Sequence, residues 1–144
     1  MTRLMGLDHG SKRIGLAIGD TETGLAFARP ALRRRDTATD IQTLAQIARD
    51  EGAETIVMGL PRNIDGSEGV QAAAARKFGE RLAAIGLAVD FQDERLTSWQ
   101  ALEQMGPRRG RDRRSGELDS AAARLILQEY LDAGPRPRFP QEAE

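Results

Sequence analysis

The sequence predicts an α/β fold in which a mixed five-stranded sheet has helices on both faces. Two short apolar segments at 3–8 and 13–19 are separated by a four-residue turn, and later apolar runs alternate with segments of helical periodicity. The expected order is strand, strand, strand, helix, strand, helix, strand, helix, helix, which is a meander followed by alternating units. Because 144 residues is about the size of one domain, we expect a single domain over 1–133. The proline-rich, charged segment 134–144 is expected to be a flexible tail.

The first two segments predict a hairpin, and a third strand is expected over 25–33. Since side chains alternate along a strand, one face of this hairpin combines mostly small residues with one carboxylate. These residues are Leu4, Gly6, Asp8, Gly15, Ala17 and Gly19. We therefore expect Asp8 to stand on a surface that another group can approach closely. The adjacent His9 should point to the opposite face and have a structural role.

The middle of the chain predicts two helices separated by a buried strand at 55–58. The first helix is expected from Thr39, with Ile41, Leu44, Ala45 and Ala48 facing the core, and Gly52 should end it. The second helix should begin with Ser67 as its N-cap and stop at Gly86. Its expected buried stripe is Val70, Ala74, Phe78, Leu82 and Ile85.

The last third predicts one strand and two helices. Alternating Leu87, Val89 and Phe91 indicate a strand that ends at Asp93 and Glu94. Thr97 followed by Gln100 is a capping-box pattern, so a helix should begin near Ser98. A final helix is expected from Asp119 to Ala133, with Ala122, Ala123, Ile126, Leu127 and Tyr130 facing inward.

Composition excludes several classes of site. The chain has no cysteine and one histidine, which excludes zinc ribbons, iron–sulfur clusters, disulfide scaffolds and cysteine nucleophiles. Any bound metal must therefore be held by oxygen ligands. No signal peptide or membrane-length apolar run is present, so we expect a cytoplasmic protein with no membrane partner. The net charge of −1 by itself gives no reason to expect nucleic acid.

Three carboxylates are predicted at the ends of elements: Asp8, Glu94 and Asp119. Ligands of α/β sheets bind beside strand ends, and oxygen ligands suit Mg²⁺ or Mn²⁺. Two such ions can promote an in-line phosphoryl displacement. Each residue also has a plain structural interpretation: Asp119 as a helix cap, Asp8 in an Asx turn, and Glu94 paired with Arg95 or solvated.

Two segments are candidates for phosphate binding. Five arginines lie close together and are opposed only by Asp112: Arg108, Arg109, Arg111, Arg113 and Arg114. They are placed to bind phosphates bidentately, although a solvated loop would have the same composition. The turn-rich segment 59–67, with Arg62 and Asn63, leads into a helix N-terminus and is equally compatible with phosphate binding or with turn formation alone. Neither a P-loop nor a dinucleotide-binding motif occurs.

Four segments together, 6–17, 57–69, 93–98 and 119–128, resemble the YqgF or RuvX family of RuvC-like nucleases. The resemblance implies a ribonuclease H-like fold and a divalent-metal nuclease acting on structured RNA in pre-16S rRNA processing, with Holliday junction resolution in DNA as an alternative. The family's acidic positions fall on Asp8, Glu94 and Asp119, and its basic positions fall on Lys12, Arg13 and Arg95. Departures are small: Gly19, Ser98 and Ser115 stand where Ser, Thr and Lys are usual.

Other classes remain open from the sequence. A non-catalytic RNA-binding or transcription factor on the same fold would bind RNA without cleaving it. A sugar-kinase or actin-like ATPase shares the Asp-x-Gly opening but needs two such domains. A junction resolvase needs a symmetric dimer, so we expect either a monomer or a homodimer.

Overall fold

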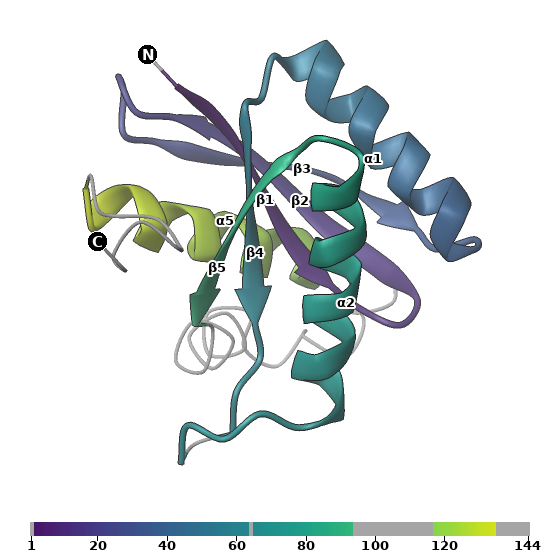
Figure 1. Cartoon of the computed structure of the whole chain (residues 1–144). Coiled ribbons are helices and arrows are strands. Elements are labelled where there is room, and N and C mark those ends of the chain that lie inside the picture. Colours follow the sequence, from purple (N-terminus) through teal and green to yellow (C-terminus); the bar gives the residue numbers. More distant parts are fainter. Residues whose placement is uncertain (1, 64, 94–116, 135–144) are drawn as a thin grey trace, which may run out of the picture.

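The computed structural model describes residues 2–63, 65–93 and 117–134, which form a sheet between two helical layers (Figure 1). The strands are β1 (Arg3–His9), β2 (Arg13–Asp20), β3 (Ala26–Arg33), β4 (Thr55–Leu60) and β5 (Ala88–Asp93). The helices are α1 (Thr37–Glu51), α2 (Val70–Ala84) and α5 (Glu117–Asp132). The helix expected near Ser98 and the tail after residue 134 lie outside the described residues.

The sheet has the strand order β3-β2-β1-β4-β5. Strand β2 is antiparallel to both β1 and β3, whereas β4 is parallel to both β1 and β5. Helices α1 and α2 cover one face and α5 covers the other (Figure 1). The predicted mixed five-stranded sheet with helices on both faces is therefore confirmed.

Alternation along the strands separates the core into two parts. On β1, Met5 and Leu7 pack with residues of α1 and α2, while Leu4 packs with α5. The larger part lies under α1 and α2. The smaller part contains Ala17, Ala26 and Val57 from the strands and Ala123, Ile126 and Leu127 from α5.

Helix α1 follows the sequence prediction closely. Its N-cap is Asp36, whose carboxylate accepts a 2.8 Å bond from the Thr39 amide. Gly52 ends the helix with φ of 71°, a left-handed conformation that favours glycine. The helix begins two residues before Thr39, because the cap satisfies the amides of a first turn that has no apolar period.

Helix α2 differs from the prediction in its start and in its buried face. Its N-cap is Gly69 rather than Ser67, since the Ser67 hydroxyl donates to Asp65 at 2.6 Å within the preceding turn. Val70 is 88% exposed, and Ala74 and Ile85 are also exposed. The buried residues are Ala72, Ala75, Phe78, Gly79 and Leu82.

Helix α2 is rotated about its axis relative to the predicted orientation because Gly79 allows a close approach to the sheet. A Cβ on Gly79 would lie 2.8 Å from Cζ of Phe91 and 3.2 Å from Sδ of Met58. Gly79 therefore lets the helix lie close to the sheet with Phe78 and Leu82 buried, and Val70 is left in solvent.

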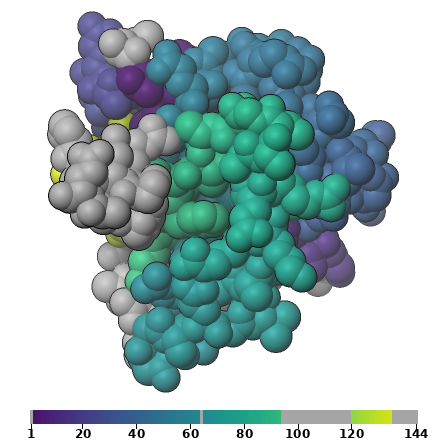
Figure 2. All heavy atoms as spheres, viewed as in Figure 1, coloured from purple at the N-terminus to yellow at the C-terminus, as the bar shows by residue number. Residues whose placement is uncertain are grey.

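The space-filling view shows α1, α2 and the segment between β4 and α2 on one surface of the molecule (Figure 2). Part of β5 is visible between α2 and that segment. Within the described part of the chain, no helix combines the length and apolar character needed to cross a membrane.

Candidate active site at the carboxyl edge of the sheet

Asp8 lies near the end of β1, at the edge where the parallel strands β1, β4 and β5 have their carboxyl ends (Figure 1). It pairs with Gly15 of β2, and the next residue of β4 beyond the Leu7–Met58 pair is Gly59. The glycines on both neighbouring strands carry no side chain beside the half-buried carboxylate. The predicted coincidence of the small-residue faces is confirmed by the pairs Leu4–Gly19, Gly6–Ala17 and Asp8–Gly15.

The group that approaches this small-residue surface is helix α5. A Cβ on Gly6 would lie 2.9 Å from Cβ of Leu127 and 3.0 Å from the Ala123 carbonyl oxygen. Glycine at position 6 therefore lets the helix backbone lie directly against β1.

Two hydrogen bonds to β3 give the direction of α5. The Ser120 hydroxyl donates to the Arg29 carbonyl at 2.6 Å, and Gln128 accepts from the Ala26 amide at 2.9 Å. Through the strand register, Arg29 lies level with Leu7 of β1, whereas Ala26 lies level with Leu4. Helix α5 thus runs antiparallel to β1, and its N-terminus faces the carboxyl edge.

This direction places the backbone of residue 119 near the end of β1. Residue 119 is four residues, about 6 Å along the helix, before Ala123, which lies on Gly6. Asp8 is two residues, roughly 6.6 Å, beyond Gly6 in the corresponding direction. The side chain of Asp119 lies outside the described residues, although the predicted buried stripe through Ala122 and Ala123 is confirmed.

Strand β5 ends at the same edge. Gln92 pairs with Gly59 and lies on the α5 face, where its amide donates to Glu129 at 3.5 Å. The strand ends at Asp93. Glu94, the third predicted acid, follows directly and lies outside the described residues.

On the opposite face, His9 belongs to a network centred on Arg34. The Arg34 guanidinium donates to the carboxylate of Asp40 at 2.8 Å and to the Gly10 carbonyl at 3.1 Å. Its Nη1 lies 3.0 Å from Nε2 of His9, and it lies 5.3 Å from the Phe78 ring centroid. Asp40 is buried, so this ion pair links the end of β1 to the start of α1.

The network keeps His9 neutral. The pKa of His9 is lowered to about 4, chiefly by burial. The nearby positive charge of Arg34 also lowers this pKa, and the negative charge of Asp40 raises it by a smaller amount. Because arginine only donates, Nε2 of His9 is the acceptor of their hydrogen bond. The expected structural role of His9 agrees with this position on the face away from Asp8, where its ring also lies 4.7 Å from that of Phe78.

Four of the predicted phosphate-binding residues lie in or directly beside turns at the same edge. Lys12 is exposed between β1 and β2, and Arg13 begins β2 half-buried. The Lys12 carbonyl accepts from the Arg34 amide at 2.8 Å, which fixes this turn. Arg62 and Asn63 follow β4, where the Asn63 amides hold a turn closed by Ser67. The remaining predicted residues, Arg95, Arg108, Arg109, Arg111, Arg113 and Arg114, lie outside the described residues.

Sequence reasoning missed the Arg34–Asp40 pair. A usable signal was present, because Asp40 is four residues before Leu44 and so lies on the core-facing stripe of α1. A buried aspartate requires a partner.

The described part of the site offers oxygen ligands for a cation. Cysteine is absent from the chain and His9 is turned to the other face, so Asp8 presents the kind of donor that Mg²⁺ and Mn²⁺ take. Among the described residues there is no group of three potential metal ligands. The carboxylate of Asp8 fits a divalent cation in donor type.

The comparisons with known proteins agree on one family. A family model described as RuvX, Holliday junction resolvase, matches residues 2–133. A Moorella thermoacetica protein with the name of a pre-16S rRNA nuclease is 46% identical over 135 residues, covering 90% of this chain and 94% of its own. A Thermosynechococcus vestitus protein of the same name is 42% identical over 135 residues, covering 92% and 89%.

Solved structures agree on the fold. T. thermophilus RuvC in complex with a Holliday junction substrate has a TM-score of 0.56 at 13% identity, covering 92% of this chain and 95% of its own. Fowlpox virus resolvase, in complex with Holliday junction DNA, has a TM-score of 0.57 at 11% identity, covering 94% and 100%. At such identities the likeness concerns the fold alone, and it confirms the expected ribonuclease H-like architecture. The chain belongs to the RuvX family.

Proposed function

We propose that this protein is a divalent-metal-dependent nuclease that hydrolyses phosphodiester bonds in structured RNA during pre-16S rRNA processing. The observation that carries the proposal is the position of Asp8, at the carboxyl edge and beside the N-terminus of α5. The names of the relatives support the substrate, because both proteins described above are named for pre-16S rRNA cleavage.

In this proposal Asp8, Glu94 and Asp119 hold Mg²⁺ or Mn²⁺. The antiparallel course of α5 brings residue 119 to the end of β1, and Glu94 directly follows the last residue of β5. When bound, the cation lowers the pKa of a water and stabilises charge on the phosphoryl oxygens. The three carboxylates orient that chemistry by fixing the cation against a rigid strand end.

His9 is not the general base of the reaction. It lies on the other face of β1, and its Nε2 accepts a hydrogen bond from Arg34. Its role is to hold the end of β1 in place, together with the Arg34 bond to the Gly10 carbonyl.

Basic residues at the same edge bind the RNA backbone in this proposal. Lys12 and Arg13 lie directly after β1, and Arg62 and Asn63 lie directly after β4. We include Arg95 because it follows Glu94 in the sequence, and the arginines at 108–114 because they precede Asp119. Cationic side chains position a phosphate backbone without reading its sequence.

The test is cleavage of precursor 16S rRNA by Asp8→Asn, with Asp50→Asn as the matched control. Asp50 is exposed on α1 and has the same charge change. We expect Asp8→Asn to abolish cleavage while keeping RNA binding and thermal stability, and the control to cleave normally. A chelator should stop the wild-type enzyme, and added Mg²⁺ or Mn²⁺ should restore it. Undiminished cleavage by Asp8→Asn would refute the site.

Holliday junction resolution is the second candidate, because the matching family model has that description. A four-way DNA junction and precursor rRNA should therefore be offered to the same preparation side by side. A resolvase must place two active sites on one junction, so light scattering should then show a dimer. Preferential cleavage of the junction by a dimer would favour this candidate over RNA processing.

A further inference from the structure

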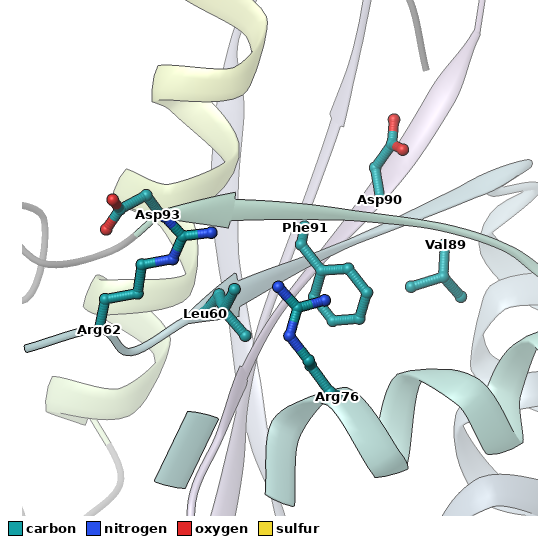
Figure 3. Close-up of a pocket in the computed structure, with 7 residues that line it drawn as sticks. All are labelled: Leu60, Arg62, Arg76, Val89, Asp90, Phe91 and Asp93. Atoms are coloured by element: carbon teal, nitrogen blue, oxygen red, sulfur yellow. The ribbon is translucent and has the colours of Figure 1, made fainter. Parts of the chain in front are cut away.

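A pocket lies on the face of the sheet opposite Asp8. It has a volume of about 390 Å³ and lies at the carboxyl ends of β4 and β5, against α2 (Figure 3). Its apolar wall consists of Leu60, Val89 and Phe91, and its polar wall includes Arg62 and Arg76. The volume is within the range of roughly 300–1,000 Å³ that is usual for sites of small ligands.

Arg76 forms a fixed, flat surface in this pocket. Its guanidinium donates to both carboxylate oxygens of Glu68, at 2.8 and 2.7 Å, and lies 5.3 Å from the Phe91 ring centroid. Two parallel hydrogen bonds and an aromatic ring together define the plane of the group. The side chain is still 42% exposed, so a ligand can reach it without displacing these contacts.

Arg62 contributes an unused donor. Its Nε is 3.6 Å from Oε2 of Glu68, too far for a hydrogen bond, and it is buried without a hydrogen-bond partner among the described residues. A buried N–H group that lacks an acceptor among the described residues favours a ligand that brings one.

The remaining charges in and around the pocket favour a neutral ligand over a free anion. The two arginines are matched by Glu68 and by Asp93, which lies beside Arg62 (Figure 3). Asp90 points to the other side of β5, where its carboxylate accepts a 2.5 Å bond from Tyr130. The ligand should therefore be flat, mostly uncharged and able to accept a hydrogen bond.

A nucleobase has these properties. Unpaired bases stack on aromatic rings and on guanidinium planes, and their carbonyl and ring nitrogen atoms accept hydrogen bonds. We propose that this pocket binds one unstacked nucleobase of a single-stranded RNA segment that crosses the carboxyl edge of the sheet. This proposal rests on the nuclease function proposed above.

The position relative to Asp8 explains why the segment should be single-stranded. β4 and β5 are the next two strands after β1, so the pocket and Asp8 are separated laterally by roughly 5–10 Å of sheet. They lie on opposite faces, because Leu60 and Phe91 pack with the α1 and α2 side whereas Asp8 lies on the α5 side. An RNA chain that reaches both must turn around the edge and release a base, which a continuous duplex does not do.

The test measures binding of a short oligoadenylate that contains one fluorescent aminopurine base, with chelator present so that no cleavage occurs. The variants are Arg76→Met and Arg76→Lys, and Arg81→Met, exposed on the same helix and outside the pocket, is the matched control. Loss of one stacking surface should weaken binding about 5- to 100-fold. Lysine keeps the charge but lacks the plane, so Arg76→Lys should lose nearly as much affinity as Arg76→Met. The aminopurine base leaves its stack with neighbouring adenines on entering the pocket, so its fluorescence should rise on binding to the wild-type protein and to Arg81→Met.

Three outcomes would overturn the proposal: wild-type affinity in Arg76→Met, full retention in Arg76→Lys, or equal binding of a duplex of the same sequence. A second variant, Arg62→Met, removes the buried donor and should also weaken binding. Thermal melting of each variant separates these effects from unfolding. Cleavage of precursor 16S rRNA by Asp8→Asn is scored separately, so failure of the base pocket and failure of the nuclease function give different results.

Discussion

Replacing Gly6 by alanine should separate helix α5 from the sheet. The added Cβ would lie 2.9 Å from Cβ of Leu127 and 3.0 Å from the carbonyl oxygen of Ala123. The first distance is roughly 0.6 Å or more short of the optimal separation of two carbon atoms. The obstacle on the other side is helix backbone, which cannot move by changing a rotamer. The helix itself must therefore shift.

The cost of this shift can be bounded. Overpacking of a well-packed site costs about 1–3 kcal/mol, and Gly→Ala returns roughly 0.4–1 kcal/mol by restricting the unfolded chain. We expect a net loss in the free energy of unfolding of about 1–2 kcal/mol, or a fall in Tm of about 3–8 °C at this chain length. Because α5 contains Asp119, a displacement of this size should also reduce cleavage, by up to about 100-fold.

Urea unfolding, thermal melting and cleavage of precursor 16S rRNA measure the three effects. Gly69→Ala is the matched control, because its added Cβ would meet nothing nearer than Nδ2 of Asn63 at 3.9 Å. Because Gly69 is the N-cap of α2, where alanine is disfavoured, that control should cost up to about 1 kcal/mol of stability and should leave cleavage unchanged. Wild-type stability in Gly6→Ala would refute the close packing of α5 on β1, and wild-type cleavage in a destabilised variant would refute the coupling of that packing to the site.

Three further predictions concern polar groups in the core. Asp40→Leu should lower stability by about 3–5 kcal/mol in urea unfolding, since it leaves the Arg34 charge unpaired, and adding Arg34→Met should restore most of the loss. Because the folded pKa of His9 is about 4, below the ordinary 6.5, the unfolded chain binds its proton first. Its contribution to stability should be complete above pH 6.5 and be lost as the pH falls towards 4, and His9→Gln in chelator should flatten that part of the stability profile. Tyr130→Phe should cost about 1–3 kcal/mol by removing the 2.5 Å bond to the buried Asp90, and unchanged thermal melting would contradict that importance.

The sheet could be predicted because its information is local. Alternation along 3–9 and 13–20 fixes which side chains share a face, and a one-residue error would have moved every side chain to the wrong side. The same reasoning placed Asp8 on the small-residue surface and His9 on the other face. What the sequence could not identify is the group that fills the space above Gly6, since α5 is more than 100 residues away along the chain.

The buried face of α2 could not be predicted from the sequence for a related reason. Val70, Ala74 and Phe78 have a regular helical spacing, and hydrophobicity alone favours burying Val70. The actual face is chosen by the contact of Gly79 with Phe91, which belongs to a strand whose register with α2 no local pattern contains. The N-cap was misjudged because Asp65 binds the Ser67 hydroxyl in the preceding turn, and capping rules do not describe that competition.

The adjacent residues Asp8 and His9 lie on opposite faces of β1 at its carboxyl end and have different surroundings. On one face, Arg34 joins Asp40, His9 and the Gly10 carbonyl, so the chain is fixed within two residues of Asp8. The charge of Arg34 is matched by Asp40 on that face. The backbone next to Asp8 is therefore held in place by these bonds. Because Arg34 and Asp40 have opposite charges, the pair adds little net charge near Asp8. A strand end held in this way suits the proposed role of Asp8, in which the carboxylate keeps its geometry and its negative charge to bind a cation.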